Sequence, residues 1–155
     1  MRIILALLVL FMPLTVPSAA SATTLRTERL EIRTPQGIRS FIVEIADTDK
    51  TREQGMMGRK SLAPNRGMLF DFKATEEVGF WMKNTPLSLD IIFIRKNGTI
   101  ARIAANAVPQ STAILRSGEP VLAVLELAGG QAAKQGIRPG QLVHHRIFGT
   151  ALRGR

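Results

Sequence analysis

The sequence contains no cysteine and no tyrosine, and it has one tryptophan among its 155 residues. The missing cysteines exclude disulfide bonds, thiolate metal ligands and a cysteine nucleophile. Stability must therefore come from the hydrophobic core alone, for which the sequence has 45% hydrophobic residues. A single tryptophan, with no aromatic residues interleaved with basic ones, argues against a nucleic-acid stacking platform, so we expect no nucleic-acid partner.

Acidic residues are also scarce. The sequence has 12 Asp and Glu but 21 Lys and Arg, which gives a formal net charge of +9. Part of the excess lies at the C-terminal end, where Arg138, Arg146, Arg153 and Arg155 follow the last acidic residue, Glu126. A basic tail in an exported protein suits contact with an anionic envelope surface. The alternative is that the charge serves solubility alone.

Long hydrophobic runs are missing except at the N-terminus. Arg2 is followed by an apolar run over residues 3–12, and then by small residues that end in Ala20-Ser21-Ala22. A positive start, a short apolar stretch and a small-x-small site are typical of a secretory signal peptide over residues 1–22. The run is too short to span a bilayer. We therefore expect a periplasmic or secreted protein that is cleaved after Ala22 and does not span the membrane.

The remaining residues, 23–155, are expected to form one domain, because no repeat or linker divides them. Alternating or dense apolar residues predict short strands over 26–34, 38–46, 67–70, 79–82, 89–96, 99–105, 121–127 and 141–147. Helical patterns are confined to 47–59, with a possible N-cap at Asp47 or Thr48, and 131–135. These elements predict a mainly β (β-rich α+β) fold, a compact barrel or sandwich of about eight or nine short strands with one or two small helices.

Turn residues predict how neighbouring strands connect. Pro35-Gln36-Gly37 separates the first two strands and predicts a hairpin. Asn97-Gly98 fits both central positions of a type I′ turn and predicts a second hairpin. Gly136 is expected to end the second helix in the left-handed conformation. Pro139-Gly140 predicts a turn that needs glycine at its third position.

Several motifs occur together in one order along the chain. They are Val43-Glu44-Ile45-Ala46, Gly55-Met56-Met57 with Arg59, Gly67-Met68-Leu69-Phe70, Phe80-Trp81-Met82-Lys83-Asn84-Thr85, Leu89-Asp90-Ile91-Ile92-Phe93-Ile94, Val124-Leu125-Glu126-Leu127 and residues 136–140. This set resembles the uncharacterised family named domain of unknown function 192, over about residues 26–148. The resemblance implies a small β-rich domain, often found behind a signal peptide in bacteria, with no established enzyme activity or ligand. One departure is Gln141, where the family often has an acidic residue.

The best candidate for a ligand site is a patch of mixed character around the tryptophan. It combines Trp81, Lys83 and Asn84 with Asp90 and Arg59. An aromatic face beside a few polar groups is the combination that stacks on a sugar ring and hydrogen-bonds its hydroxyls. In an extended segment Trp81 and Lys83 would share one face, together with Thr85, and Asn84 would lie on the other.

The alternative for this patch is a purely structural role. Trp81 would fill the core, residues 84–86 would make a turn, and Asp90 would accept hydrogen bonds from backbone amides.

Asp90 and Glu126 each lie in an apolar run, which predicts that both carboxyl groups are buried. Two such groups close together could act as the acid and base of a hydrolase. Otherwise each accepts backbone hydrogen bonds or pairs with Arg59 or Arg102. The sequence has no Gly-x-Ser-x-Gly elbow, phosphate-binding loop or dinucleotide-binding motif, which makes other enzyme classes less favoured.

Four methionines, at positions 56, 57, 68 and 82, could supply thioether ligands for Cu(I) in an exported protein. Core packing by methionine is the better interpretation, because no Met-x-Met or Met-x-x-Met spacing occurs. His144 and His145 are adjacent on a predicted strand, so their side chains should point to opposite faces and not share one ion. We therefore assign no metal and no cofactor. The leading hypothesis is an exported, non-enzymatic module that binds an envelope ligand such as a glycan.

Overall fold

The computed structural model describes residues 24–151. The predicted signal peptide, and Arg153 and Arg155 of the basic tail, lie outside this range. Within it, no helix has the length and apolar character needed to cross a membrane.

Residues 24–151 form nine β-strands, two short α-helices and one 3-10 turn. The strands are β1 (Thr27–Thr34), β2 (Gly37–Ala46), β3 (Arg66–Glu76), β4 (Gly79–Phe80), β5 (Leu89–Ile94), β6 (Ile100–Ala107), β7 (Leu115–Arg116), β8 (Val121–Ala128) and β9 (Val143–His144). The helices are α1 (Asp49–Gln54) and α2 (Gln131–Gln135), and the 3-10 turn is η1 (Arg146–Phe148). The predicted mainly β fold with small helices is confirmed.

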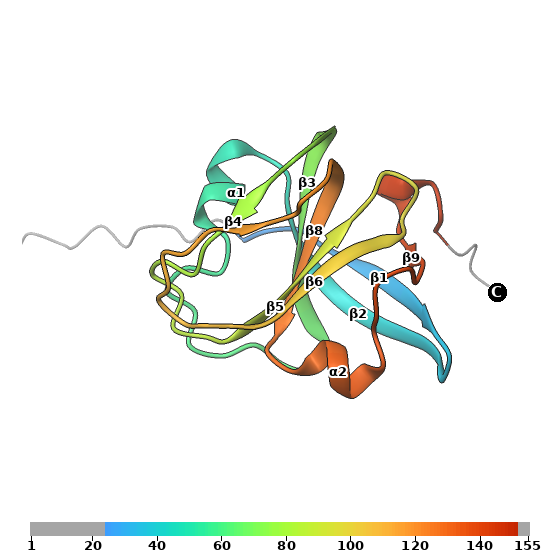
Figure 1. Cartoon of the computed structure of the whole chain (residues 1–155), viewed down its shortest axis with the longest axis horizontal. Helices are drawn as coiled ribbons and strands as arrows, with labels where there is room; N and C mark the ends of the chain where they lie inside the picture. The colour runs from blue at the N-terminus through green and yellow to red at the C-terminus, as the bar shows by residue number, and fades with distance from the viewer. Residues whose placement is uncertain (1–23, 152–155) are drawn as a thin grey trace, which may run out of the picture.

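Seven strands form one curled sheet in the order β6-β5-β8-β3-β2-β1-β9, and β4 pairs with β7 in a small second sheet. Figure 1 shows the large sheet bent into a half-barrel. A bridge between Thr99 and Leu142 links the start of β6 to the chain before β9. The two edges of the sheet are therefore joined at one end, which protects backbone groups that an open sheet would leave unpaired.

Most of the predicted local structure is confirmed, although the helix after β2 is shorter than predicted. β1 and β2 form the expected antiparallel hairpin, with Thr34 opposite Gly37. Thr48 is the N-cap of α1, where its side chain accepts a hydrogen bond from the backbone N–H of Thr51. The helix ends at Gly55, whose φ of 45° lies in the region that favours glycine.

The turn at Asn97-Gly98 joins β5 and β6 as expected, but the predicted type I′ geometry is wrong. Gly98 has a positive φ of 83°, whereas the φ of Asn97 is not positive. The Asn97 side chain instead accepts a hydrogen bond from the backbone N–H of Thr99, and the register shifts beside Ile94. This pattern fits a three-residue loop with a glycine bulge, which tolerates asparagine outside the left-handed region.

The last predicted strand, 141–147, is also wrong in extent. Only Val143 and His144 pair with β1, and η1 follows immediately. The His145 side chain accepts a hydrogen bond from the backbone N–H of Ile147, which starts this turn and ends the strand.

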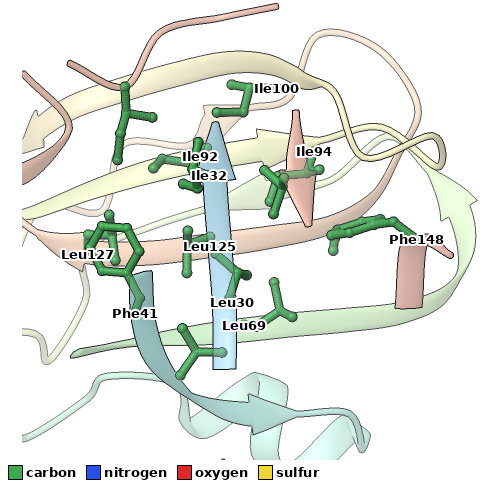
Figure 2. Packing of buried hydrophobic residues seen from close by; sticks show 14 of the residues in the cluster. Leu30, Ile32, Phe41, Leu69, Ile92, Ile94, Ile100, Leu125, Leu127 and Phe148 are labelled. Atoms are coloured by element: carbon green, nitrogen blue, oxygen red, sulfur yellow. The ribbon is translucent and has the colours of Figure 1, made fainter. Parts of the chain in front are cut away.

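The two faces of the sheet are buried in two separate clusters. Along β8, Leu125 and Leu127 point to the inside of the half-barrel, and Val124 points to the outside. Figure 2 shows the inner cluster, which includes Phe41 from β2 and Phe148 from η1. The outer cluster is covered by the segments around α1 and β4, and the candidate site lies on this outer side.

Candidate functional site

A cavity of about 670 Å³ lies between α1, β4 and the outer face of the sheet. Figure 1 shows α1 and β4 next to one another, close to β3 and β8. The apolar residues that line the cavity are Met56, Met57, Phe70, Phe72, Phe80 and Trp81. The polar residues that line it are Lys50, Arg52, Glu53, Gln54, Lys83, Asn84, Thr85 and Glu126. The lining thus combines aromatic and methionine side chains with a larger number of polar ones, and a volume of this size is typical of small-ligand sites.

The segment after β4 brings the predicted residues Trp81, Lys83 and Asn84 to this cavity. The backbone N–H of Thr85 donates to the carbonyl of Met82, at 3.0 Å, so the chain turns here. The expectation of an extended segment with Trp81 and Thr85 on one exposed face is therefore wrong, and Thr85 is buried. Asn84 holds the turn with a φ of 56°, a conformation that asparagine adopts more readily than most residues.

The Trp81 side chain is not a core residue, since 45% of it is exposed. Its ring lies 5.3 Å from the Lys83 ammonium nitrogen, which is cation–π distance. The alternative in which Trp81 fills the core is therefore wrong. A partly exposed aromatic ring at the edge of a cavity is available to stack against a ligand.

Glu126 lies at the floor of the cavity, although the sequence did not place it with the Trp81 patch. It is 4% exposed, and its Oε2 atom has no hydrogen-bond partner. Burial raises the pKa of this carboxyl group to about 8, although the charge of Arg59 acts in the opposite direction. At neutral pH the group therefore holds its proton and presents a hydroxyl donor.

Asp90, in contrast, does not belong to the cavity. It is fully buried, and its carboxylate accepts hydrogen bonds from the backbone N–H groups of Asn106, Gly130 and Ala132, at 2.8, 3.0 and 2.7 Å. These bonds fix β6 and the start of α2 to β5. The assignment of Asp90 to the ligand patch is therefore corrected to the structural role that was its alternative.

The paired-carboxylate hypothesis also fails on geometry. Asp90 is opposite Leu127 in the β5–β8 ladder, and Glu126 is opposite Ile91. Residues opposite one another share a face, and neighbours along a strand do not. The two carboxyl groups therefore point to opposite faces of the sheet and cannot serve one reacting bond.

Arg59 lies beside the site without lining it. Its guanidinium donates two hydrogen bonds to the carboxylate of Glu44, at 2.6 and 2.5 Å. Glu44, Met68 and Glu126 lie next to one another across β2, β3 and β8. Arg59 therefore contributes its charge near Glu126 but is held by Glu44, which corrects its assignment as a direct ligand residue.

The histidines lie elsewhere, next to β1. The Nδ1 atom of His144 is 2.8 Å from the carbonyl of Thr150, and the Nε2 atom of His145 is 3.0 Å from the Glu28 carboxylate. No group of three or more His, Asp or Glu side chains within residues 24–151 is arranged to hold a metal ion.

The four methionines considered as Cu(I) ligands do not all have the same surroundings. Met56, Met68 and Met82 are buried in the outer core cluster, as expected for packing. Met57 lines the cavity, and so does Met56.

A family described as "Uncharacterized ACR", domain of unknown function 192, matches residues 31–145. The chain belongs to this family. The resemblance inferred from the motifs is thus confirmed, and the family carries no described activity. No curated protein matches the DUF192 chain.

Two solved structures resemble it closely. A protein from Sinorhizobium meliloti 1021, provisionally described as a transcription regulator, is 44% identical and has a TM-score of 0.79, covering 82% of this chain and 99% of its own. A protein of unknown function from Novosphingobium aromaticivorans DSM 12444 is 36% identical and has a TM-score of 0.78, covering 85% of this chain and 94% of its own. These relatives support the half-barrel fold of the DUF192 chain.

Proposed function

We propose that this DUF192 protein is an exported, non-enzymatic binding module for a glycan of the cell envelope. The single observation that carries the proposal is the cavity between α1 and β4, where a half-exposed tryptophan ring adjoins polar side chains. Saccharides bind in such sites by stacking on the aromatic ring and by hydrogen bonding to a few fixed polar groups. Trp81 supplies the ring, and Lys83, Asn84 and Glu126 supply the polar contacts.

A binding role is favoured over hydrolysis because the site holds one deeply buried carboxyl group and lacks the second one that glycoside hydrolysis needs. Glu53 also lines the cavity, but it is an exposed residue of α1 and is not positioned by the core. A role in transcription, as described for the S. meliloti protein, has less support. The α-helices described in this chain have six and five residues, which is short for a helix that reads the major groove.

Binding is tested with isothermal titration calorimetry on the purified protein. The probes are chitotetraose and the disaccharide of N-acetylglucosamine and N-acetylmuramic acid. We expect at least one probe to bind and Trp81→Ala to weaken it at least tenfold. Ile38→Ala is the matched control, because Ile38 is 40% exposed but lies on β2, away from the cavity. Mass spectrometry should recover the saccharide unchanged after incubation.

Two results contradict the proposal: the absence of binding to any saccharide, or equal binding by Trp81→Ala and the wild type. Release of shortened saccharide would instead make the protein a hydrolase. Export is tested separately by N-terminal sequencing of the protein from a periplasmic fraction. A first residue of Thr23 supports removal of residues 1–22, and an intact Met1 contradicts it.

A further inference from the structure

The floor of the cavity holds a carboxyl group that the protein itself leaves without a partner. Glu126 is 4% exposed, and its Oε2 atom forms no hydrogen bond to any described residue. Buried polar groups in folded proteins are nearly always paired, because an unpaired one loses its interactions with water and gains nothing in return. An unpaired group in the lining of a cavity is therefore a place where a ligand atom would complete the hydrogen bonding.

The surroundings of Glu126 favour its uncharged form. Arg59 is the charged group that acts on Glu126, and Glu44, which binds Arg59, lies two strands away on the same sheet face. Lys50, Arg52, Glu53 and Lys83 line the same cavity. Both terminal nitrogens of the Arg59 guanidinium are bound to Glu44, so the charge of this cation is already balanced by another carboxylate. Desolvation dominates and raises the Glu126 pKa to about 8. At neutral pH the floor therefore offers a hydroxyl donor, which requires an acceptor oxygen on the ligand.

The mouth of the cavity has the opposite character, because cations border it on two sides. Lys50 from α1 and Lys83 from the segment after β4 are exposed and form no ion pair with any residue of the range 24–151. Arg52 also lines the cavity, and its guanidinium is bound to Asp49. Glu53 is the only other acidic side chain besides Glu126 in this lining. The chain as a whole carries a net charge of +9, which adds to the attraction of anions.

We propose that the cavity binds a saccharide that carries a carboxylate, with a hydroxyl or carbonyl oxygen accepting a hydrogen bond from Glu126. The ligand carboxylate binds Lys50 and Lys83 at the mouth, and the sugar ring stacks on Trp81. This inference rests on the proposed function, because it names the class of saccharide that the same site takes. A neutral saccharide would use the ring and the floor but would leave both lysines without an anionic partner.

The charge preference is tested with one pair of probes. These are the disaccharide of N-acetylglucosamine and N-acetylmuramic acid, and the same disaccharide with its carboxylate methylated. Calorimetry at pH 6.5 should show the free acid binding at least tenfold more tightly than the ester. The double variant Lys50→Gln and Lys83→Gln should reduce this preference to less than threefold. Lys96→Gln, which removes an exposed lysine from the β5–β6 loop, is the control and should keep the preference.

The donor role of Glu126 is tested by pH with two variants of the same residue. Glu126→Gln keeps a donor that does not titrate, and Glu126→Leu removes the donor. Between pH 6 and pH 9 the wild type should lose about tenfold in affinity, because one unit above a pKa about one tenth of the group keeps its proton. Glu126→Gln should show no such loss. Glu126→Leu should bind at least tenfold more weakly at pH 6 and should not vary with pH.

The outcomes separate this inference from the proposed function. If the acid and the ester bind equally and Trp81→Ala still abolishes binding, the acidic ligand is excluded, and the binding module stands. If Glu126→Leu binds as tightly as the wild type at pH 6, the donor role is excluded. If neither probe binds, this inference fails, and if chitotetraose does not bind either, the proposed function fails with it. Circular dichroism of each variant confirms that the fold is retained, so that a loss of affinity reports on the site.

Discussion

The clearest physical test of the structure is the replacement of Glu126 by glutamine, measured as a function of pH. In the folded protein this carboxyl group has a pKa of about 8, because it is buried without a hydrogen-bond partner for Oε2. In the unfolded chain it returns to its ordinary value of 4.5. Between these two values the folded state binds a proton that the unfolded state has released. Stability must therefore fall as the pH rises through this window, and level off above pH 8.

The size of the effect follows from the same two values. Each pH unit inside the window changes the free energy of unfolding by about 1.4 kcal/mol for one proton. From pH 5 to pH 8 the wild type should therefore lose about 3.5 kcal/mol relative to Glu126→Gln, which binds no proton; this is less than three full units because the slope decreases near each pKa. Any constant offset caused by the amide group cancels, because only the change in the difference with pH is used. A loss of this size is a large part of the 5–15 kcal/mol that typical domains possess.

The assay is urea unfolding followed by far-ultraviolet circular dichroism at pH 5, 6, 7 and 8. Glu76→Gln is the control, because Glu76 is an exposed carboxylate on β3 and forms no ion pair within residues 24–151. Its difference from the wild type should stay constant across the series. If the Glu126→Gln difference also stays constant within about 0.5 kcal/mol, the carboxyl group titrates as an exposed one does. That result would refute a buried, protonated Glu126.

Three further predictions concern other parts of the fold. Asp90→Ala should lower the free energy of unfolding by about 3 kcal/mol or more in urea titrations, because it leaves three buried amide groups without an acceptor. Gly67→Ala should lower it by about 1–3 kcal/mol, since a Cβ there would lie 2.6 Å from the Glu126 carbonyl oxygen; an unchanged midpoint would contradict this packing. Burial lowers the pKa of His145, so the folded state binds fewer protons than the unfolded state just below pH 6.5 and stability falls on acidification. This contribution opposes that of Glu126 in the same pH window, so His145→Gln is compared with the wild type at each pH. The melting temperature of His145→Gln relative to the wild type should rise from pH 6.5 to pH 5, and a constant difference would contradict a buried neutral imidazole.

Sequence periodicity was sufficient to predict most strands of the large sheet, because burial imposes a regular pattern on them. Strands such as β1 and β2 alternate between a buried and an exposed face. The central strands β5 and β8 are apolar except for Asp90 and Glu126, because both their faces are covered. The two-residue strands β4 and β7 carry no such period, and β7 was not predicted. Their pairing depends on the β6–β8 connection, where the backbone N–H of Met82 donates to the carbonyl of Ser111. Contacts of this kind depend on tertiary structure and leave no local signal.

The candidate site was predictable only in part. Trp81, Lys83 and Asn84 were predicted together because they are neighbours in the sequence, and they do line one cavity. The separation of Asp90 from Glu126 depends on the register of β5 against β8, which residues far apart in the sequence determine. A shift of that register by one residue would place both carboxyl groups on the same face. The assignment of Glu126 to the cavity therefore needed the three-dimensional structure.

Glu126 is also the position where stability and function are expected to oppose one another. Its neighbours along β8 are valine, leucine and alanine, which pack without the desolvation penalty that a carboxyl group carries. At pH 7 this penalty is about 3 kcal/mol on the pKa values given above. Such local conflicts in an otherwise consistent strand are typical of functional positions. Glu126→Leu should therefore unfold at a higher urea concentration at pH 7 than the wild type, while it loses saccharide affinity. A variant that lost both stability and affinity would instead indicate that the carboxyl group supports the fold.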